Sequence, residues 1–289
     1  MQVNQIFKIC FSPTGTTAKV VSALADVLAE ELGLEQQIYV YDFTQPEGRT
    51  FFPQLGEDDL VIFGMPTYAG RLPNLMLPYL KETVQGSGAL AIPVVTFGNR
   101  SFDNSLIELR DILESKGFRT IGAAACSCEH SFSYKLGAGR PDAADLAELK
   151  DFAGSILTKL AKLEDCGCTE SSDTPTHTPV SVSGVPAEEN HGGYYQPRDR
   201  HGNSIDIRKV KPKTDMEKCT QCGLCAEICA MGAIDPQDVS SVPGICIKCG
   251  ACFKRCPASA KYYDDPGYLY HKTELEEMYA RRASNAFFL

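Results

Sequence analysis

Two groups of four cysteines are the residues in this 289-residue chain whose spacing most clearly indicates chemistry. Each group has the spacing C-x2-C-x2-C-x3-C, and together they hold eight of the thirteen cysteines. Closely spaced thiolates are ligands of iron–sulfur clusters, and paired C-x2-C segments can also bind zinc. A zinc site needs four ligands, however, and this quartet occurring twice is a poor zinc pattern. The spacing therefore favours iron–sulfur clusters over zinc. The two groups are Cys219, Cys222, Cys225 and Cys229, and Cys246, Cys249, Cys252 and Cys256.

The repeated motif resembles the bacterial two-cluster ferredoxins over about residues 212–262. The resemblance implies two 4Fe–4S clusters, each held by three cysteines of one motif and the fourth cysteine of the other. It assigns Cys219, Cys222, Cys225 and Cys256 to one cluster, and Cys246, Cys249, Cys252 and Cys229 to the other. One departure is Ala230, because the family has a proline at that point, as at Pro257. We expect this change to alter the surroundings of a cluster rather than remove it.

A loop near the N-terminus indicates a second kind of site. It joins the apolar run at residues 6–11 to a helical pattern that ends at Gly33. Hydroxyl groups, a close-approaching glycine and the free N–H groups of a helix N-terminus favour a bound phosphate, although an ordinary Ser/Thr helix cap is the alternative. A single such loop without G-x-G-x-x-G suits a terminal phosphate better than a dinucleotide. The loop comprises Ser12, Pro13, Thr14, Gly15, Thr16 and Thr17.

Two more loops follow the third and fourth predicted strands, so they should reach the same edge of a parallel sheet. Each offers an aromatic ring, backbone amides and an arginine. A flat aromatic cofactor anchored by its phosphate could lie against Tyr68 or Phe102, or these rings could instead cover the core. The first loop contains Pro66, Thr67, Tyr68, Ala69, Gly70 and Arg71. The second contains Gly98, Asn99, Arg100, Ser101, Phe102 and Asp103.

Together, the three loops resemble those with which flavodoxins hold FMN, and the resemblance covers about residues 3–162. Flavodoxins more often have threonine at the position of Ser12, which keeps the hydroxyl group. The short, proline-containing stretch 43–58 stands where a second full helix would be expected. Because the chain has no tryptophan, any stacking on the flavin must use tyrosine or phenylalanine. His130, in a fourth loop, could bind the flavin, relay a proton, contact the second domain or make a structural hydrogen bond.

Alternating apolar strand runs and amphipathic helical runs over residues 1–163 predict an α/β domain with a doubly wound, five-stranded parallel sheet. The strands are expected near residues 6–11, 37–41, 60–64, 89–97 and 120–126. Main helices are expected after the first loop and at residues 104–116 and 142–163. A Pro/Gly/Ser-rich linker at 164–211 precedes a small α+β ferredoxin domain with a helical tail at 212–289.

Composition excludes several classes of function. The net charge of −9 argues against nucleic-acid binding, and no apolar run is long enough for a membrane span. The N-terminal residues lack the pattern of a secretion signal, so we expect a cytoplasmic protein. Its expected partners are redox proteins, and a homo-oligomer is possible. Cys10 is expected to be a buried apolar residue, and the pairs Cys126/Cys128 and Cys166/Cys168 receive no role.

The whole chain resembles flavodoxin–ferredoxin fusion proteins of anaerobic bacteria and archaea. A flavin exchanges one or two electrons, whereas a 4Fe–4S cluster carries one, so the resemblance implies a low-potential carrier that couples one- and two-electron steps. One alternative is a flavin-dependent reductase of a small quinone, nitro or sulfur compound, with His130, Arg71 and Arg100 around an open pocket. Another is a redox sensor or scaffold, in which the cofactors do not exchange electrons rapidly.

Overall fold

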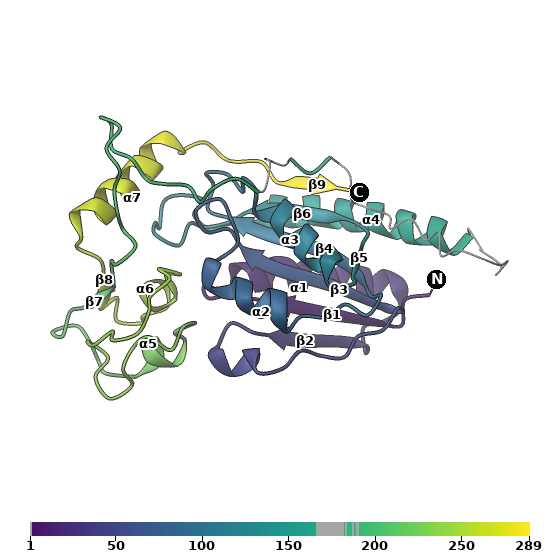
Figure 1. The fold of residues 1–289 in the computed structure, drawn as a ribbon, viewed down its shortest axis with the longest axis horizontal. Helices are drawn as coiled ribbons and strands as arrows, with labels where there is room; N and C mark the ends of the chain where they lie inside the picture. The colour runs from purple at the N-terminus through teal and green to yellow at the C-terminus, as the bar shows by residue number, and fades with distance from the viewer. Residues whose placement is uncertain (1, 166–181, 183, 187, 189–190) are drawn as a thin grey trace.

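The computed structural model describes residues 2–165, 182, 184–186, 188 and 191–289 (Figure 1). Five parallel strands form the centre of the larger domain in the order β2-β1-β3-β4-β6. This is the strand order of the flavodoxin-like doubly wound fold, so the predicted fold class is confirmed. The strands are β1 (Gln5–Cys10), β2 (Ile38–Asp42), β3 (Asp59–Pro66), β4 (Leu90–Phe97) and β6 (Ala123–Ser127), and the short β5 (Arg119–Thr120) pairs with β4.

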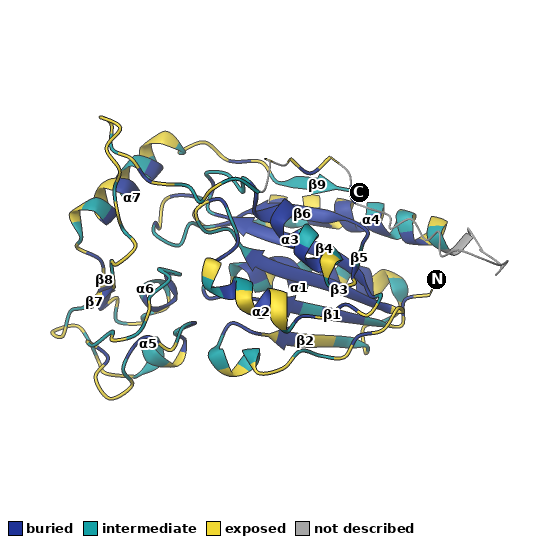
Figure 2. Ribbon diagram, viewed as in Figure 1, coloured by how far each residue is buried: buried dark blue, intermediate teal, exposed yellow. Residues whose placement is uncertain are grey.

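Helices cover both faces of this sheet and bury its strands (Figure 2). On one face, Leu24 of α1 and Phe152 of α4 belong to one core cluster with Ile6 of β1; on the other, Leu80 of α2 and Leu109 of α3 belong to a second. Between β2 and β3 there is only a turn of 3-10 helix, η1, as the proline-containing stretch predicted. The helices are α1 (Thr16–Leu32), η1 (Pro46–Arg49), η2 (Asn74–Met76), α2 (Leu77–Glu82), α3 (Ser105–Ser115) and α4 (Ala143–Asp165).

The chain returns to this sheet near its C-terminus. Helix α7 (Pro266–Met278), capped by the side chain of Asp265, is followed by strand β9 (Ala286–Phe288). Strand β9 pairs antiparallel with β6, placing Ala286 opposite Ala125 and Phe288 opposite Ala123. The sequence predicts a helical tail here and gives no indication of the strand. Three residues are too few for a readable alternation, and their conformation depends on pairing with a distant part of the chain.

The smaller module is an internal repeat. Strands β7 (Lys213–Thr214) and β8 (Lys261–Tyr262) pair antiparallel, and each cysteine motif contains one short helix, α5 (Leu224–Glu227) or α6 (Ala251–Lys254). Each helix follows a glycine with positive φ, 77° at Gly223 and 79° at Gly250. Both loops therefore turn in the same way before their third cysteine, and the repeat seen in the sequence is also a repeat of backbone conformation.

Described parts of the linker lie along the larger domain. The backbone N–H of Tyr195 donates to Ala69 O at 2.8 Å, and the hydroxyl of Tyr194 donates to Leu72 O at 2.9 Å. Further back, the backbone N–H of Glu188 donates to the Asn104 side chain at 3.0 Å. These contacts hold the linker against helix α3 and the loop that follows β3.

Candidate functional site: two cysteine-lined cavities beside a flavodoxin-like rim

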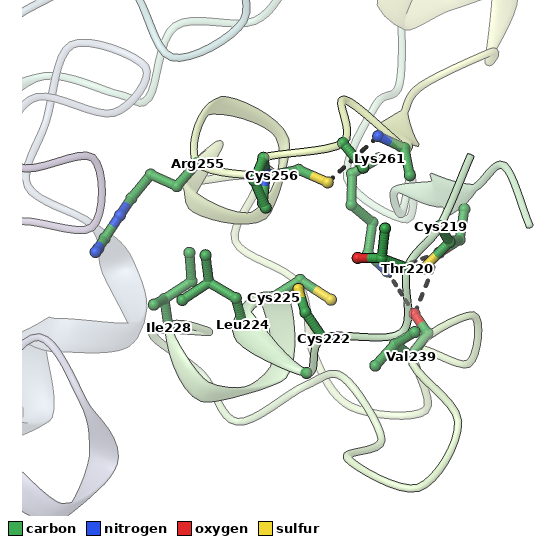
Figure 3. Close-up of a pocket in the computed structure, with 15 residues that line it drawn as sticks. Cys219, Thr220, Cys222, Leu224, Cys225, Ile228, Val239, Arg255, Cys256 and Lys261 are labelled. Carbon is green, nitrogen blue, oxygen red and sulfur yellow. Dashed lines mark hydrogen bonds between the residues drawn. The ribbon is translucent and has the colours of Figure 1, made fainter.

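The eight motif cysteines line two cavities of similar size. In Figure 3 the sulfur atoms of the first set point toward a common space between the loops. Among the described residues, no three His, Cys, Asp or Glu side chains lie close enough together to hold a single metal ion. The first cavity is lined by Cys219, Cys222, Cys225 and Cys256, and the second by Cys229, Cys246, Cys249 and Cys252.

Each cavity therefore combines three cysteines of one motif with the fourth cysteine of the other. Backbone N–H groups point at the sulfurs in the same way in both repeats. Gln221 N donates to the sulfur of Cys219 at 3.4 Å, and Lys248 N to that of Cys246 at 3.4 Å. The fourth cysteines have equivalent bonds: Ala233 N donates to the Cys229 sulfur at 3.2 Å, and Ala260 N to the Cys256 sulfur at 3.3 Å. Such donors stabilise negatively charged sulfur, and these surroundings fit a 4Fe–4S cluster.

Burial distinguishes the two cavities. Cys222 of the first is exposed, whereas Cys252 of the second is buried and Cys249 packs against the core of the larger domain. Burial raises the pKa of the Cys249 thiol to about 12, so it is protonated near neutral pH unless a metal displaces the proton. The second cavity is thus the one that faces the larger domain.

Ala230, the departure from the ferredoxin pattern, lies at this contact. It is fully buried in the core cluster of the larger domain, and its carbonyl accepts a hydrogen bond from the guanidinium of Arg49. The same guanidinium donates to Phe43 O at 2.9 Å and to Thr44 O. Residue 230 is therefore part of the docking surface between the modules. Arg49 was not singled out in the sequence, since its partner lies far along the chain.

A second set of contacts also joins the smaller module to the larger domain. The ammonium of Lys254 on α6 donates to Glu129 at 2.7 Å and lies 3.9 Å from the ring centre of Tyr134. The hydroxyl of Tyr134 in turn donates to Phe253 O at 3.1 Å. The ion pair is partly shielded from solvent, because the Lys254 side chain is only 8% exposed. The two modules are held together by apolar packing, ion pairing and hydrogen bonds.

The predicted phosphate loop lies at the N-terminus of α1. Gly15, the N-cap residue of α1, has φ of 88° and no side chain with which to cap the helix. Ser12 Oγ accepts from Ala18 N at 2.9 Å, but the N–H groups of Thr16 and Thr17 have no acceptor in the described structure. The half-buried hydroxyls of Thr14 and Thr16 lie 3.3 Å apart at this helix end. Free N–H groups and hydroxyls at a helix N-terminus fit the phosphate of an FMN.

The hydroxyl of Thr17 has a different partner. It is buried and hydrogen-bonded to the Thr96 hydroxyl on β4, with 2.7 Å between the oxygens. The hydroxyl of Thr17 thus has a protein partner, whereas its backbone N–H is open to a phosphate. The hydroxyl of Thr44, a residue not predicted for the site, accepts from Ser12 N at 2.7 Å and fixes the start of the loop.

The loop after β3 forms a tight hairpin. Tyr68 and Arg71 pair through their backbones, and Ala69 and Gly70 between them have φ of 51° and 79°. Pro66 ends β3, and the N–H of Thr67 donates to Thr96 O at 2.7 Å. Burial raises the pKa of Tyr68, and negative charge on the Cys249 and Cys246 sulfurs adds to the effect. Tyr68 thus lies within electrostatic range of the second cysteine cavity, although it does not line it.

The two rim arginines have protein partners. Arg71 makes a bidentate ion pair with the buried carboxylate of Glu108, at 2.9 and 2.6 Å. Arg100 pairs with Asp103 and lies 4.4 Å from the ring centre of Tyr195 in the linker. These pairs satisfy much of the hydrogen-bonding capacity of both guanidinium groups, and neither stands as a free cation at the rim.

The loop after β4 binds the C-terminal segment. The Asn99 side chain donates to Tyr279 O at 2.7 Å and to Arg281 O at 2.6 Å, and accepts from Ala283 N at 3.1 Å. The Asn99 side chain therefore forms its hydrogen bonds with the C-terminal segment, a contact that was not predicted from the sequence. Phe102 packs against Phe97 with ring centres 5.6 Å apart, which matches the interpretation of this ring as a cover on the core.

His130 lies beside Gly98, where an added Cβ would come within 2.3 Å of its ring. Its Nδ1 accepts from Phe132 N at 3.0 Å, a hydrogen bond within its own loop. Burial lowers the pKa of His130 to about 3, with nearby His271, Lys254 and Arg100 adding to the effect. The imidazole is therefore neutral at pH 7 and has a structural contact of the kind considered from the sequence.

Two buried histidines predict that the protein loses stability in mild acid. Burial and Arg100 lower the pKa of His271 to about 4, and both His130 and His271 ordinarily titrate near 6.5. Below pH 6.5 the unfolded chain binds protons that the folded protein does not. We expect the free energy of unfolding to fall by about 1.4 kcal/mol per pH unit for each histidine. Urea unfolding between pH 7 and about pH 5 measures this slope. His271→Phe should make it shallower, and an unchanged slope would contradict the assignment.

The remaining cysteines do not join either cavity. Cys10, Cys126 and Cys128 are buried in the larger domain, and burial raises the pKa of Cys10 to about 12. This agrees with the expected role of Cys10 as an apolar core residue. Cys166 and Cys168 lie outside the described residues. No helix in the described part of the chain has the length and apolar character needed to cross a lipid bilayer.

Known proteins are similar to different parts of the chain. Residues 211–234 match the family model of a 4Fe-4S binding domain. An uncharacterized protein of Methanocaldococcus jannaschii is 30% identical over 141 residues, which is 46% of this chain and 87% of that protein.

Similar solved structures include an archaeal flavodoxin, with 15% identity, 54% of this chain and 99% of that chain covered, and a TM-score of 0.39. Flavodoxin 2 of Bacillus cereus has 14% identity, 54% and 99% coverage, and a TM-score of 0.38. The strand order and the cysteine motifs together define a flavodoxin-like domain joined to a ferredoxin-type module, an architecture of redox electron transfer. The chain belongs to the same family as the Methanocaldococcus jannaschii protein and is a fusion of these two parts.

Proposed function

We propose that this protein transfers electrons between an FMN at the flavodoxin-like rim and two 4Fe–4S clusters in the cysteine-lined cavities. A bound flavin would supply the change between two-electron and one-electron chemistry, and the clusters would carry single electrons. The loop at the start of α1 would hold the FMN phosphate, and the hairpin after β3 would lie beside the ring. The cross-motif cysteine sets would each hold one cluster.

The observation that carries this proposal is the position of the second cavity. Cys249 packs against the core of the larger domain, and Cys246 and Cys249 are close enough to Tyr68 to raise its pKa. Met231 and Ile247, which also line this cavity, pack against the same core. An FMN at the rim and a cluster in the second cavity would therefore be neighbours in one chain, without a partner protein between them.

The alternative of a small-molecule reductase has less support. It called for an open pocket with Arg71, Arg100 and His130 ready to bind an acceptor. Arg71 is paired with Glu108, Arg100 with Asp103, and His130 accepts from its own loop. These rim side chains already bind other groups of the protein, so they are not available to bind a small acceptor. This favours a relay to partner proteins.

The relay is tested by an anaerobic redox titration of the cofactor-complete protein, followed by absorbance and electron paramagnetic resonance together. We expect flavin and two sets of cluster signals that exchange electrons during the titration. Clusters without a flavin would refute the FMN assignment. Flavin and clusters that do not equilibrate with each other would instead support a sensor or scaffold.

The phosphate assignment predicts a specific loss of FMN. Replacing Thr14 and Thr16 together with valine removes two hydroxyls at the free N-terminus of α1, and we expect FMN to bind at least about tenfold more weakly. Thr17→Val should instead lower the free energy of unfolding, since that hydroxyl bonds to Thr96. Quenching of flavin fluorescence measures the affinity, with Thr158→Val on the exposed side of α4 as the control. Equal affinity in the double variant would contradict the assignment.

A further inference from the structure

A buried lysine lines the first cysteine cavity. Lys261, on β8, is only 2% exposed, and it borders the same space as Cys219, Cys225 and Cys256. Its ammonium donates to the Thr214 hydroxyl at 2.8 Å and to the carbonyl of Val239. Figure 3 shows the Lys261 side chain among the residues that line the pocket. The charge is therefore fixed in place beside the cysteine sulfurs.

Lys261 forms no ion pair with a described carboxylate, and both of its acceptors are neutral. Asp238 is exposed, and hydrogen bonds from Ser240, together with the charge of Lys261, lower its pKa. A buried ammonium without a counter-charge is costly, so its surroundings call for an anion. A 4Fe–4S cluster with four thiolate ligands carries negative charge and would meet this need. Arg255 also borders the cavity, but it is exposed and extends away from the sulfurs in Figure 3.

The second cavity has no lysine at the equivalent position of the repeat, and the positive charges near it belong to Lys248 and Lys211, which act on Cys246. Lys261 stands five positions after Cys256, and the residue five positions after Cys229 is Ile234. Ile234 is buried and lines the second cavity, as Lys261 lines the first. At this position of the internal repeat, the first cavity has a buried cation and the second has an apolar side chain. The two cavities differ in electrostatics at equivalent positions.

We propose that Lys261 makes the first cluster the more easily reduced of the two, so that electrons pass from the second cluster to the first. This rests on the two-cluster function proposed above. One electron leaves the second cluster, which is oxidised, and enters the first, which is reduced; no proton or other reactant is needed. The fixed positive charge stabilises the negative charge that reduction adds. Exposed Cys222 then makes the first cavity the exit to a one-electron acceptor protein.

The test is the reduction potential of each cluster in the full-length holoprotein, read by electron paramagnetic resonance during anaerobic titration. Lys261→Met removes the charge from a side chain of similar length, and we expect the reduction equilibrium of the first cluster to shift at least tenfold toward the oxidised form, about 59 mV. Lys261→Arg keeps the positive charge, so the first cluster of this variant should keep a potential close to that of the unaltered protein. Lys218→Met removes an exposed charge paired with Asp215 and should change little. An unchanged potential in Lys261→Met overturns the proposal.

A second measurement leaves Lys261 intact. Two clusters of unequal potential should be seen in the unaltered protein, and Cys222→Ser should remove the higher-potential signal while Cys229→Ser removes the lower one. The reverse assignment, or two equal potentials, overturns the role of Lys261. A protein that holds fewer than two clusters would instead refute the proposed function, so the two failures can be told apart.

Discussion

Cys229→Ser should damage the second cluster, although Cys229 belongs to the first motif. The second cavity is lined by Cys229 together with Cys246, Cys249 and Cys252, so its loss leaves that cavity with three thiolates. We expect the iron content to fall from about eight to about four atoms per chain, because each cubane holds four irons. Iron analysis gives the loss, and electron paramagnetic resonance shows which cluster remains.

Cys222→Ser is the matched control, because it changes the same motif but a residue of the first cavity. The two serine variants should therefore lose different clusters and keep complementary signals. Loss of the same cluster in both would show that each motif binds its own cluster and would overturn the crossed arrangement. Cys126→Ser, in the buried end of β6, should retain both signals, since Cys126 lines neither cavity.

Removing the carboxylate of Asp145 should cost about 3–5 kcal/mol of folding stability, because it leaves the buried charge of Arg140 without its partner. The two side chains are 1% and 5% exposed and form a bidentate pair. Arg140 also donates to Ala283 O at 2.6 Å, and Asn285 donates to Asp145 at 3.1 Å. This cluster therefore holds the segment leading into β9, and Asp145→Ala should release that strand from β6.

Urea unfolding measures the loss for Asp145→Ala, and hydrogen exchange at residues 286–288 reports whether β9 separates first. The control is Asp142→Asn at the start of the same helix. Asp142 pairs with Arg282, but the two side chains are 40% and 50% exposed, so we expect at most about 1 kcal/mol. Equal losses of stability in the two variants would mean that the buried ion pair contributes no more to stability than the exposed one.

The parts of the molecule that sequence predicts best are those fixed by local spacing. The sheet followed from alternating apolar runs, and the cysteine motifs contain their own ligand spacing. The roles of the loop residues depend on partners that are distant in the sequence, so they are harder to predict from it. Nothing near Arg71 in the sequence indicates Glu108, and nothing near Thr17 indicates Thr96, so both residues were expected at a cofactor when the structure gives them protein partners.

Two features were missed for different reasons. Strand β9 depends on pairing with β6 and is too short to leave a pattern. The difference between Lys261 and Ile234, by contrast, was visible in the sequence. It needed a position-by-position comparison of the two repeats beyond the cysteines themselves, since a lysine amid a ferredoxin-like motif would otherwise be taken as a surface residue.

The place of β9 has a consequence for how the protein is made. The ribosome releases the chain from the N-terminus, so β6 emerges long before residues 286–288 can pair with it. During that interval the larger domain has an uncovered sheet edge, to which other chains can add. Both cysteine motifs are synthesised before this edge is closed. Delayed delivery of iron would therefore prolong the exposure of the edge in nascent chains, and aggregation during iron starvation is the expected result.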